Sequence, residues 1–249
     1  MDRAFFAYLS RVARAAIAAE IANGLRADNK ASGGYDPVTE ADRAAERALR
    51  QAIETAYPDH GISGEEYGAL REEAALRWSL DPVDGTRALV CGLPSWAVLV
   101  GLVANGVHLA GMIDLPALDE TLLGIDGETT RNGEFVRTSG CARLAEARLS
   151  TTDPHLFADP APFDRVRKAV RLTRYGLDAM AYARVATGDL DLVIESGLKP
   201  HDYDALVAVV RGAGGVIGSW SGGDDFGGGD IVAAASQALY DEAVALLAE

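Results

Sequence analysis

The dipeptide Asn105-Gly106, which joins two long apolar segments, constrains the fold of this chain more than any other feature. The segments Leu93 to Val103 and Val107 to Asp114 are dominated by valine, leucine and other apolar residues. Asn-Gly between two such segments is typical of a β-hairpin turn, because both residues tolerate a positive φ. The sequence therefore predicts two paired apolar strands. Thr121 to Ile125 and Gly133 to Arg137 are expected to continue them.

The residues before this hairpin have the spacing of helices. Apolar residues recur at helical intervals from Phe5 to Ile21, and Gly24 is a suitable stop. A second helix is expected from Thr39 to Ala56, where Asp42 completes a variant of the capping box. A strand is predicted from Ala75 to Leu80.

The second half of the chain alternates strands with helices. The predicted strands are Arg148 to Thr151, Leu190 to Ile194, Val216 to Trp220 and Ile231 to Ala234. The predicted helices are Asp164 to Val170, Asp178 to Thr187, Asp202 to Arg211 and Gln237 to Leu247. The polar segments Asn29 to Pro37 and Ser221 to Asp230 are expected to be flexible connections. This pattern predicts a mixed α/β protein, with residues 1–249 forming one domain of two closely packed halves, about 1–140 and 141–249.

The charge balance limits the partners of the protein. The chain has 249 residues and a net charge of −14, which argues against nucleic acid and anionic membranes as partners. It contains no run of 18 apolar residues, the length expected of a membrane-spanning helix. The two cysteines lack the spacing of a metal site, so we expect a reducing compartment and a cytoplasmic location.

Residues 78–86 carry the strongest chemical signal. They read Trp-Ser-Leu-Asp-Pro-Val-Asp-Gly-Thr, and they place Asp81 and Asp84 where a strand is expected to end. Carboxylates are the hard oxygen ligands that Mg²⁺ prefers. Gly85 and Thr86 would offer backbone N–H groups to a phosphate at the start of a helix. Taken alone, Asp-Pro and Asp-Gly also mark ordinary turns, in which carboxylates cap nearby N–H groups.

Two other segments complete a wider pattern. Gly64-Glu65-Glu66 lies upstream, and downstream Asp202 precedes Gly212-Ala-Gly-Gly215. Together with Asp-Pro-x-Asp-Gly-Thr, these segments resemble the inositol monophosphatase superfamily of Mg²⁺-dependent, lithium-sensitive phosphatases. The resemblance extends from Val38-Thr-Glu-Ala-Asp42 to the last predicted helix. It implies a layered αβαβα sandwich of the inositol monophosphatase and fructose-bisphosphatase type, and a homodimer.

The resemblance also assigns roles to individual residues. Phosphate monoesters resist attack by water, and divalent ions help by neutralising the phosphate and acidifying a bound water. Two or three Mg²⁺ ions are expected here. The implied metal ligands are Glu65, Asp81, Asp84, Asp202 and the carbonyl of Val83, and the implied phosphate contacts are Gly85 and Thr86. Asp42 matches an acid near the third metal. Glu65 is expected to orient Thr86, whose hydroxyl would help to deprotonate the attacking water.

Each of these residues also has a purely structural explanation. Glu65 stands beside Glu66, as an exposed loop acid would. Asp202 could cap the helix that follows it, and Thr86 could cap a helix in the same way. Asp42 could be an acid in a first helical turn, where the helix dipole favours it. Capping and metal binding are compatible for Asp202.

Residues of the second half narrow the range of expected substrates. Glu195 precedes Asp202 by seven positions, where the superfamily places an acid that contacts the organic part of the substrate. Asp178 fits a second such contact, or a helix cap. Ser150-Thr-Thr-Asp-Pro154, Ala181-Tyr-Ala183 and Glu195-Ser-Gly-Leu-Lys-Pro200 are similar to bacterial histidinol-phosphate phosphatases of this superfamily. This subgroup tends to show Gly-Gly-Asp-Cys around the second acid, and Leu177 takes the place of the second glycine in this chain.

We therefore expect a Mg²⁺-dependent phosphomonoesterase that hydrolyses L-histidinol phosphate in histidine synthesis. The protonated amine of this small metabolite would suit the acids Glu195 and Asp178. An inositol-1-monophosphatase or a broad-specificity sugar-phosphate phosphatase is the alternative within the enzyme class. A non-catalytic binding or regulatory protein on the same fold is the alternative from another class.

Overall fold

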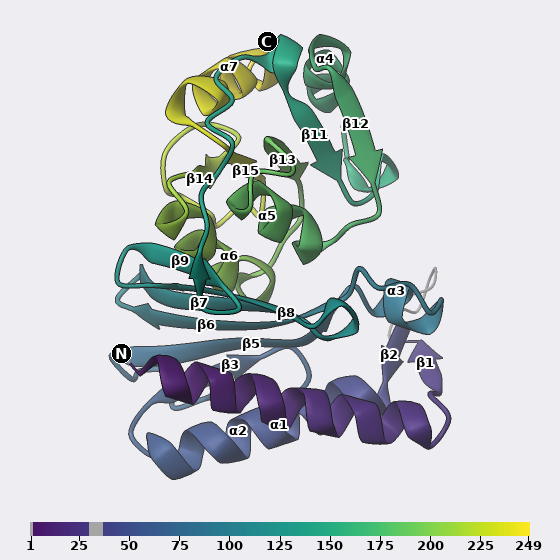
Figure 1. The fold of residues 1–249 in the computed structure, drawn as a ribbon, viewed down its shortest axis with the longest axis vertical. Helices are drawn as coiled ribbons and strands as arrows, with labels where there is room; N and C mark the ends of the chain where they lie inside the picture. The colour runs from purple at the N-terminus through teal and green to yellow at the C-terminus, as the bar shows by residue number, and fades with distance from the viewer. Residues whose placement is uncertain (1, 30–36) are drawn as a thin grey trace.

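The computed structural model describes residues 2–29 and 37–249, so most of the predicted connection from Asn29 to Pro37 lies outside the described residues. The elements form five layers: helices, a large sheet, helices, a smaller sheet and helices (Figure 1). This is the αβαβα sandwich that the resemblance implied, and the mixed α/β class is confirmed.

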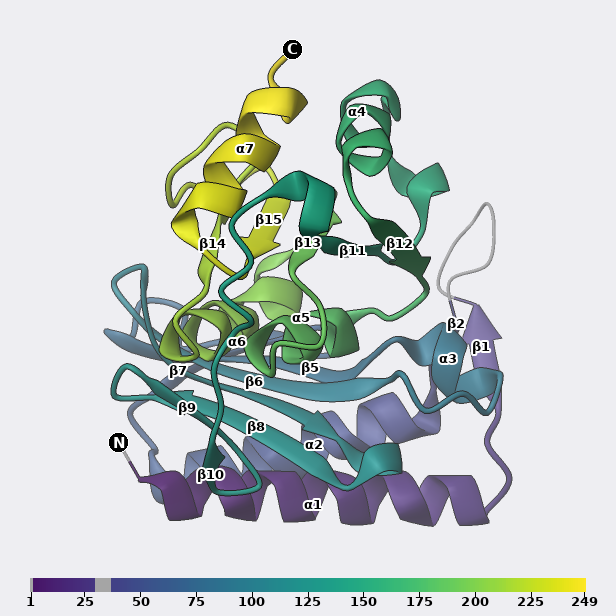
Figure 2. The ribbon, with the colours of Figure 1, turned by 45° about the horizontal axis from the view of Figure 1, so that its top comes forward.

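The first layer contains two helices, α1 (Arg3–Ala22) and α2 (Glu40–Ala56). They lie side by side against the outer face of the large sheet in both views (Figure 2). A short antiparallel pair, β1 (Ala27–Asn29) and β2 (Pro37–Thr39), leads into α2. Thr39 caps α2 as predicted, because its hydroxyl accepts a hydrogen bond from the Ala41 N–H at 3.1 Å.

The large sheet has eight strands in the order β10-β9-β8-β7-β6-β5-β3-β4. Their bounds are β3 (Gly61–Gly64), β4 (Gly68–Leu70), β5 (Leu76–Asp84), β6 (Ala97–Ala104), β7 (Val107–Leu115), β8 (Glu120–Ile125), β9 (Glu128–Arg131) and β10 (Glu134–Phe135). The predicted hairpin is confirmed: Asn105 and Gly106 turn with φ of 49° and 80° between β6 and β7.

Three strands of the large sheet differ from the prediction by more than one residue at an end. β6 begins at Ala97 instead of Leu93, because Pro94 has no N–H to offer a neighbouring strand. β5 continues to Asp84, with an irregular register between Asp81 and Asp84, so these acids lie on the distorted end of the strand. The strand expected from residues 133–137 is reduced to the two residues of β10.

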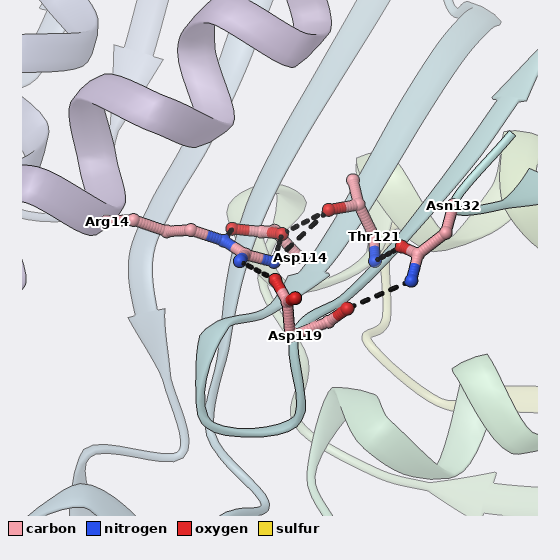
Figure 3. Close-up of polar contacts among 5 residues, drawn as sticks. All are labelled: Arg14, Asp114, Asp119, Thr121 and Asn132. Carbon is pink, nitrogen blue, oxygen red and sulfur yellow. Dashed lines mark hydrogen bonds and ion pairs between the residues drawn. The ribbon is translucent and has the colours of Figure 1, made fainter.

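A buried charge cluster fastens α1 to the large sheet (Figure 3). The carboxylate of Asp114 on β7 is fully buried and accepts two hydrogen bonds from Arg14, at 2.9 Å and 2.8 Å. Arg14 also reaches Asp119, and the Thr121 hydroxyl donates to Asp114 at 2.6 Å. Every oxygen of the buried charge therefore has a donor, which is the condition for placing a carboxylate inside a protein.

The middle layer consists of α5 (Ala179–Ala186) and α6 (Pro200–Gly212), and α6 lies unusually close to the large sheet. Gly101, Gly111 and Gly124 are in register on β6, β7 and β8, and they form a groove for α6. A β-carbon at Gly111 would lie 2.7 Å from the carbonyl carbon of Ala205, closer than real side chains approach. The row of glycines thus sets the height of α6 above the sheet.

The smaller sheet has five strands in the order β12-β11-β13-β15-β14. Their bounds are β11 (Arg148–Thr151), β12 (Leu172–Tyr175), β13 (Leu192–Glu195), β14 (Val216–Ser219) and β15 (Ile231–Ala234). α4 (Ala161–Ala169) and α7 (Gln237–Leu247) cover its outer face (Figure 1). The sequence pattern missed β12, an edge strand whose Leu172 and Tyr175 are exposed.

Two findings concern the environment of the protein. Among residues 2–29 and 37–249, no helix is long and apolar enough to cross a membrane. Cys91 and Cys141 are free thiols.

Gly111→Ala should lower the free energy of unfolding by about 1–3 kcal/mol, because the new methyl group meets backbone that cannot rotate away. Urea denaturation measures the change. Gly228→Ala is the matched control, since a β-carbon there has nothing within 4 Å. Equal midpoints for the two variants would mean that α6 does not rest on Gly111.

Candidate active site

A cavity of about 290 Å³ lies where the two sheets and the middle helices meet. It is bordered by the end of β5, the turn after β3, the end of β13 and the starts of α3 (Thr86–Val90), α5 and α6. Nine predicted site residues line it: Glu65, Asp81, Val83, Asp84, Gly85, Thr86, Asp178, Glu195 and Asp202. The tenth, Asp42, lies behind this wall and contacts Thr86. The structure thus brings together residues from both halves of the chain.

Backbone N–H groups fix the direction of the central carboxylates. Asp81 accepts a hydrogen bond from the Val83 N–H at 3.0 Å. Asp202 accepts one from the Lys199 N–H at 2.7 Å: it lies at the third position of α6 and helps to cap the helix from there, while Lys199 holds the N-cap position in front of it. In each case one carboxylate oxygen is held in place by local backbone, and the other oxygen of Asp202 lies 3.4 Å from His201 Nε2.

Asp84 is held by a segment far away in the sequence. Its Oδ2 accepts a hydrogen bond from the Ala179 N–H at 2.6 Å, at the first turn of α5. Asp178 occupies the cap position of α5, but its side chain makes no capping hydrogen bond. Asp84 therefore takes over part of that role, and this joins the end of β5 to the start of α5. The helix-cap explanation of the Asp178 side chain is wrong.

The acids of the cavity perturb one another. Burial raises the pKa of the Asp81 carboxyl well above its ordinary value, and the charges of Glu65, Asp84 and Asp202 raise it further. Burial also raises the pKa of Asp84, with the charge of Asp178 next in importance. So many carboxylates in one place favour either protons or a bound cation.

The donor set suits a hard divalent cation. Carboxylate and carbonyl oxygens are what Mg²⁺ takes from proteins, and it keeps several waters besides. Within residues 2–29 and 37–249, no three Asp, Glu, His or Cys side chains lie in a geometry that could already hold a metal ion. The cluster therefore fits Mg²⁺ in chemistry and charge, while a bound ion would have to draw the carboxylates closer together.

A hydroxyl stands beside this cluster in a chain of hydrogen bonds. Thr86 Oγ1 lies 3.1 Å from Asp42 Oδ1 and 3.0 Å from the Val83 carbonyl oxygen. Asp42 is buried, and its Oδ2 accepts hydrogen bonds from the N–H and hydroxyl of Thr39. Asp42 therefore completes the predicted capping box of α2 and faces the site with its other oxygen. The expected orientation of Thr86 by Glu65 stays a prediction.

Glu195 forms the opposite wall with its carboxylate almost completely buried. It accepts hydrogen bonds from the Thr152 N–H at 2.7 Å and hydroxyl at 2.9 Å, and from the Thr151 hydroxyl at 3.3 Å. Burial raises its pKa from 4.5 to about 7, against the opposing effect of these bonds. A carboxylate has about four acceptor sites, so Glu195 retains capacity for a ligand.

Asp178 is held in a backbone conformation that residues other than glycine rarely adopt, with φ of 48° and ψ of −141°. Such strain costs about 1–3 kcal/mol and persists where the surroundings impose it. Gly85 packs directly against it: a β-carbon on Gly85 would lie 3.1 Å from Asp178 Oδ2. Burial raises the pKa of Asp178 to about 6, while the charge of Arg87 acts in the other direction.

Several cavity residues were not singled out from the sequence. Leu156 and Leu198 contribute apolar surface to the lining, and Tyr182 also lines the cavity. The Tyr182 hydroxyl is buried and has no hydrogen-bond partner among the described residues. Thr152 and Tyr182 belong to the segments that carried the resemblance to histidinol-phosphate phosphatases, which was the one available signal for them.

Residues 3–249 match the model of the inositol monophosphatase family. The chain belongs to the inositol monophosphatase family. It is a phosphatase of that family, whose members generally use Mg²⁺, and the resemblance seen in the sequence is confirmed.

Relatives within the inositol monophosphatase family differ in name and length. A histidinol-phosphatase of Mycobacterium tuberculosis is 34% identical over 236 residues, which cover 90% of this chain and 88% of that protein. The "bifunctional phosphatase IMPL2, chloroplastic" of Arabidopsis thaliana is 46% identical over 191 residues, 75% of this chain. That match spans only about half of the plant protein, 55% of its length. The solved structure of an inositol monophosphatase from Zymomonas mobilis has a TM-score of 0.86 and 36% identity, covering 98% of this chain and 96% of that one.

The raised pKa of Glu195 predicts a pH dependence of stability. Because the folded protein binds the Glu195 proton more tightly than the unfolded chain, this residue's contribution is fully present below pH 4.5 and is lost as the pH rises to about 7. Glu195→Gln keeps the shape without the charge. Denaturation in EDTA should show that the free energy of unfolding of the variant rises relative to that of the wild type across this pH window, by up to about 3 kcal/mol. A pH-independent difference would contradict the raised pKa.

Proposed function

We propose that this chain is a Mg²⁺-dependent phosphomonoesterase that hydrolyses L-histidinol phosphate to L-histidinol and phosphate. Glu65, Asp81, Asp84, Asp202 and the Val83 carbonyl would hold two or three ions. The bound Mg²⁺ would neutralise the phosphate and acidify a water. Gly85 and Thr86, at the cavity wall beside Asp84, are the proposed phosphate contacts.

The hydrogen bonds around Thr86 support a role in moving a proton. Its hydroxyl has one hydrogen, which it can donate to Asp42 Oδ1 at 3.1 Å. Its oxygen would then keep a lone pair that could accept a proton from an attacking water. Asp42, fixed by Thr39, would act as the base through Thr86. Glu65 is proposed to help orient this hydroxyl as well as to bind metal.

The observation that carries the choice of substrate is a second pair of acids, Glu195 and Asp178, in the same cavity. Neither is needed as a metal ligand in the proposed set. A protonated amine would pair with them, and Leu156 and Leu198 would pack against a flat ring. Relatives named histidinol-phosphatase support this choice. Inositol 1-phosphate is the alternative, favoured by the relatives named inositol monophosphatase.

The remaining expectations belong to the same proposal. A homodimer, a cytoplasmic location, inhibition by Li⁺ and the division of the chain into two halves follow from the resemblance or the sequence pattern. Sedimentation velocity and inhibition by LiCl are direct tests of two of them.

Asp84→Asn should lower phosphatase activity by several orders of magnitude without unfolding the protein. The amide oxygen can still accept the Ala179 N–H, so the junction with α5 is kept while an anionic ligand is lost. Activity on p-nitrophenyl phosphate at saturating Mg²⁺ and the circular dichroism spectrum are the measurements. Turnover close to that of the wild type would remove Asp84 from the metal set.

Glu195→Gln should separate recognition from chemistry. A hydrogen bond to a charged group contributes about 1.5–3 kcal/mol, so kcat/KM for histidinol phosphate should fall about 10- to 150-fold. Activity on p-nitrophenyl phosphate, which has no amine, should change little. Inositol 1-phosphate is assayed in parallel. Equal losses on all three substrates would place Glu195 in the catalytic or structural machinery and withdraw the argument for a cationic substrate.

A further inference from the structure

One buried acid of the first half has no part in the cavity. Glu46 lies on α2, one helical turn after Asp42, and its side chain is 0% exposed. Its Oε1 accepts a hydrogen bond from Arg50 Nε at 2.7 Å. The cost of burying this ion pair is large, and apolar side chains of similar volume would serve stability as well or better. Its presence therefore calls for another explanation.

The other partners of Glu46 all belong to one turn. Its Oε2 accepts the Glu66 N–H at 2.7 Å, and its Oε1 accepts the Tyr67 N–H at 3.2 Å. Arg50 donates in turn to the carbonyl of Gly68. The pair thus satisfies the backbone of the turn between β3 and β4, which begins directly after Gly64.

This turn carries Glu65. The Glu65 N–H donates to the Leu80 carbonyl at 3.2 Å, which ties the residue to β5 just before Asp81. Glu46 holds the next two N–H groups from the opposite side. Glu65 therefore follows a backbone bond to β5 and precedes two N–H groups held by Glu46, and its side chain lines the cavity.

The Glu46 carboxylate also packs directly against Gly64. A β-carbon on Gly64 would overlap the Glu46 carboxylate and lie 2.9 Å from Arg50 Nη2. The acid therefore occupies the space that a side chain at position 64 would need. The Gly64-Glu65-Glu66 segment and Glu46 fit each other as one unit, although eighteen residues or more of chain separate them.

We propose that Glu46 is a positioning residue for metal binding: its buried carboxylate, backed by Arg50, orients the turn that presents Glu65 to Mg²⁺. This inference rests on the proposed role of Glu65 as a metal ligand. Glu46 itself touches neither metal nor substrate. Its effect is exerted through the N–H groups of Glu66 and Tyr67.

The test compares Glu46→Gln with the wild type. A glutamine has an NH₂ group in place of one carboxylate oxygen, and this group cannot accept a hydrogen bond from an N–H. The turn between β3 and β4 therefore loses part of the support that orients it. Calorimetric titration with MgCl₂, without substrate, should show about 10- to 100-fold weaker binding. Hydrogen exchange at the Glu66 and Tyr67 amides should accelerate. Activity on p-nitrophenyl phosphate should recover at high Mg²⁺, which a lost ligand would not allow.

Asp114→Asn is the matched control. Asp114 is an equally buried carboxylate with an arginine partner in the same half of the protein, and it does not line the cavity (Figure 3). This variant should lose stability while Mg²⁺ binding and the exchange of the Glu66 amide stay unchanged. Parallel losses of Mg²⁺ affinity in both variants would show a general effect of destabilisation and overturn the proposal.

Two further variants distinguish a failure of the proposed metal role of Glu65 from a failure of the proposed positioning role of Glu46. Glu65→Gln should weaken Mg²⁺ binding; if it does not, the metal role of Glu65 in the proposed function fails, and the positioning role fails with it. If Glu65→Gln weakens binding and Glu46→Gln does not, only the positioning role is overturned. Gly64→Ala displaces the Glu46 carboxylate without changing its charge. It replaces Glu46→Gln if that variant does not fold, and unchanged Mg²⁺ affinity in Gly64→Ala would equally reject the proposal.

Discussion

The close approach of α6 to the large sheet is the constraint on which the rest of this structure depends. At three cross-strand glycines no side chain stands between the sheet and the helix, so backbone packs against backbone there. The first turn of α6 carries Asp202, and the strands beneath it lead to Asp81 and Asp84. A β-carbon at these glycines would push the helix away from the sheet, and Asp202 would move with it. Packing in the interior therefore determines the dimensions of the cavity.

The starts of helices determine the orientation of several acids at the cavity. α5 and α6 begin at the cavity, and α2 begins behind its wall. At these three helix starts Asp42, Asp84 and Asp202 accept hydrogen bonds from the N–H groups of Thr39, Ala179 and Lys199. The positive end of a helix favours a carboxylate, and it also limits the rotation of that carboxylate. The same side chains thus stabilise the fold and build the site. These hydrogen bonds leave room for the proposed metal-binding and catalytic roles, because each carboxylate still has an oxygen to offer to the cavity or to Thr86.

Much of the fold was predictable where local chemistry decides. The Asn105-Gly106 turn, the cap at Thr39 and the apolar periodicity each act within a few residues, and the structure agrees with them. The acids of the cavity were recognisable because their spacing matches a family pattern. The contacts that join distant segments were not predictable. Nothing near Asp84 indicates that it binds the N–H of Ala179, and the exposed edge strand β12 has no apolar pattern to reveal it.

The strained backbone at Asp178 was equally invisible, because aspartate is an unremarkable residue at the start of a helix. Its side chain packs against Gly85, and the N–H that follows it is held by Asp84. Strain of this kind depends on the assembled neighbourhood and has no local signature. The same holds for Glu46, whose importance emerges only from the turn that it faces.

The meeting of three helix starts at and behind one cavity wall has a consequence for the lifetime of the protein. Segments that are remote along the chain come together there with an excess of negative charge that opposes their approach. A cation bound among them, as proposed, would favour the assembled state over any partly opened one. Free Mg²⁺ would then govern resistance to proteolysis and to thermal loss as well as turnover, so a cell short of the ion would lose the enzyme itself along with its activity.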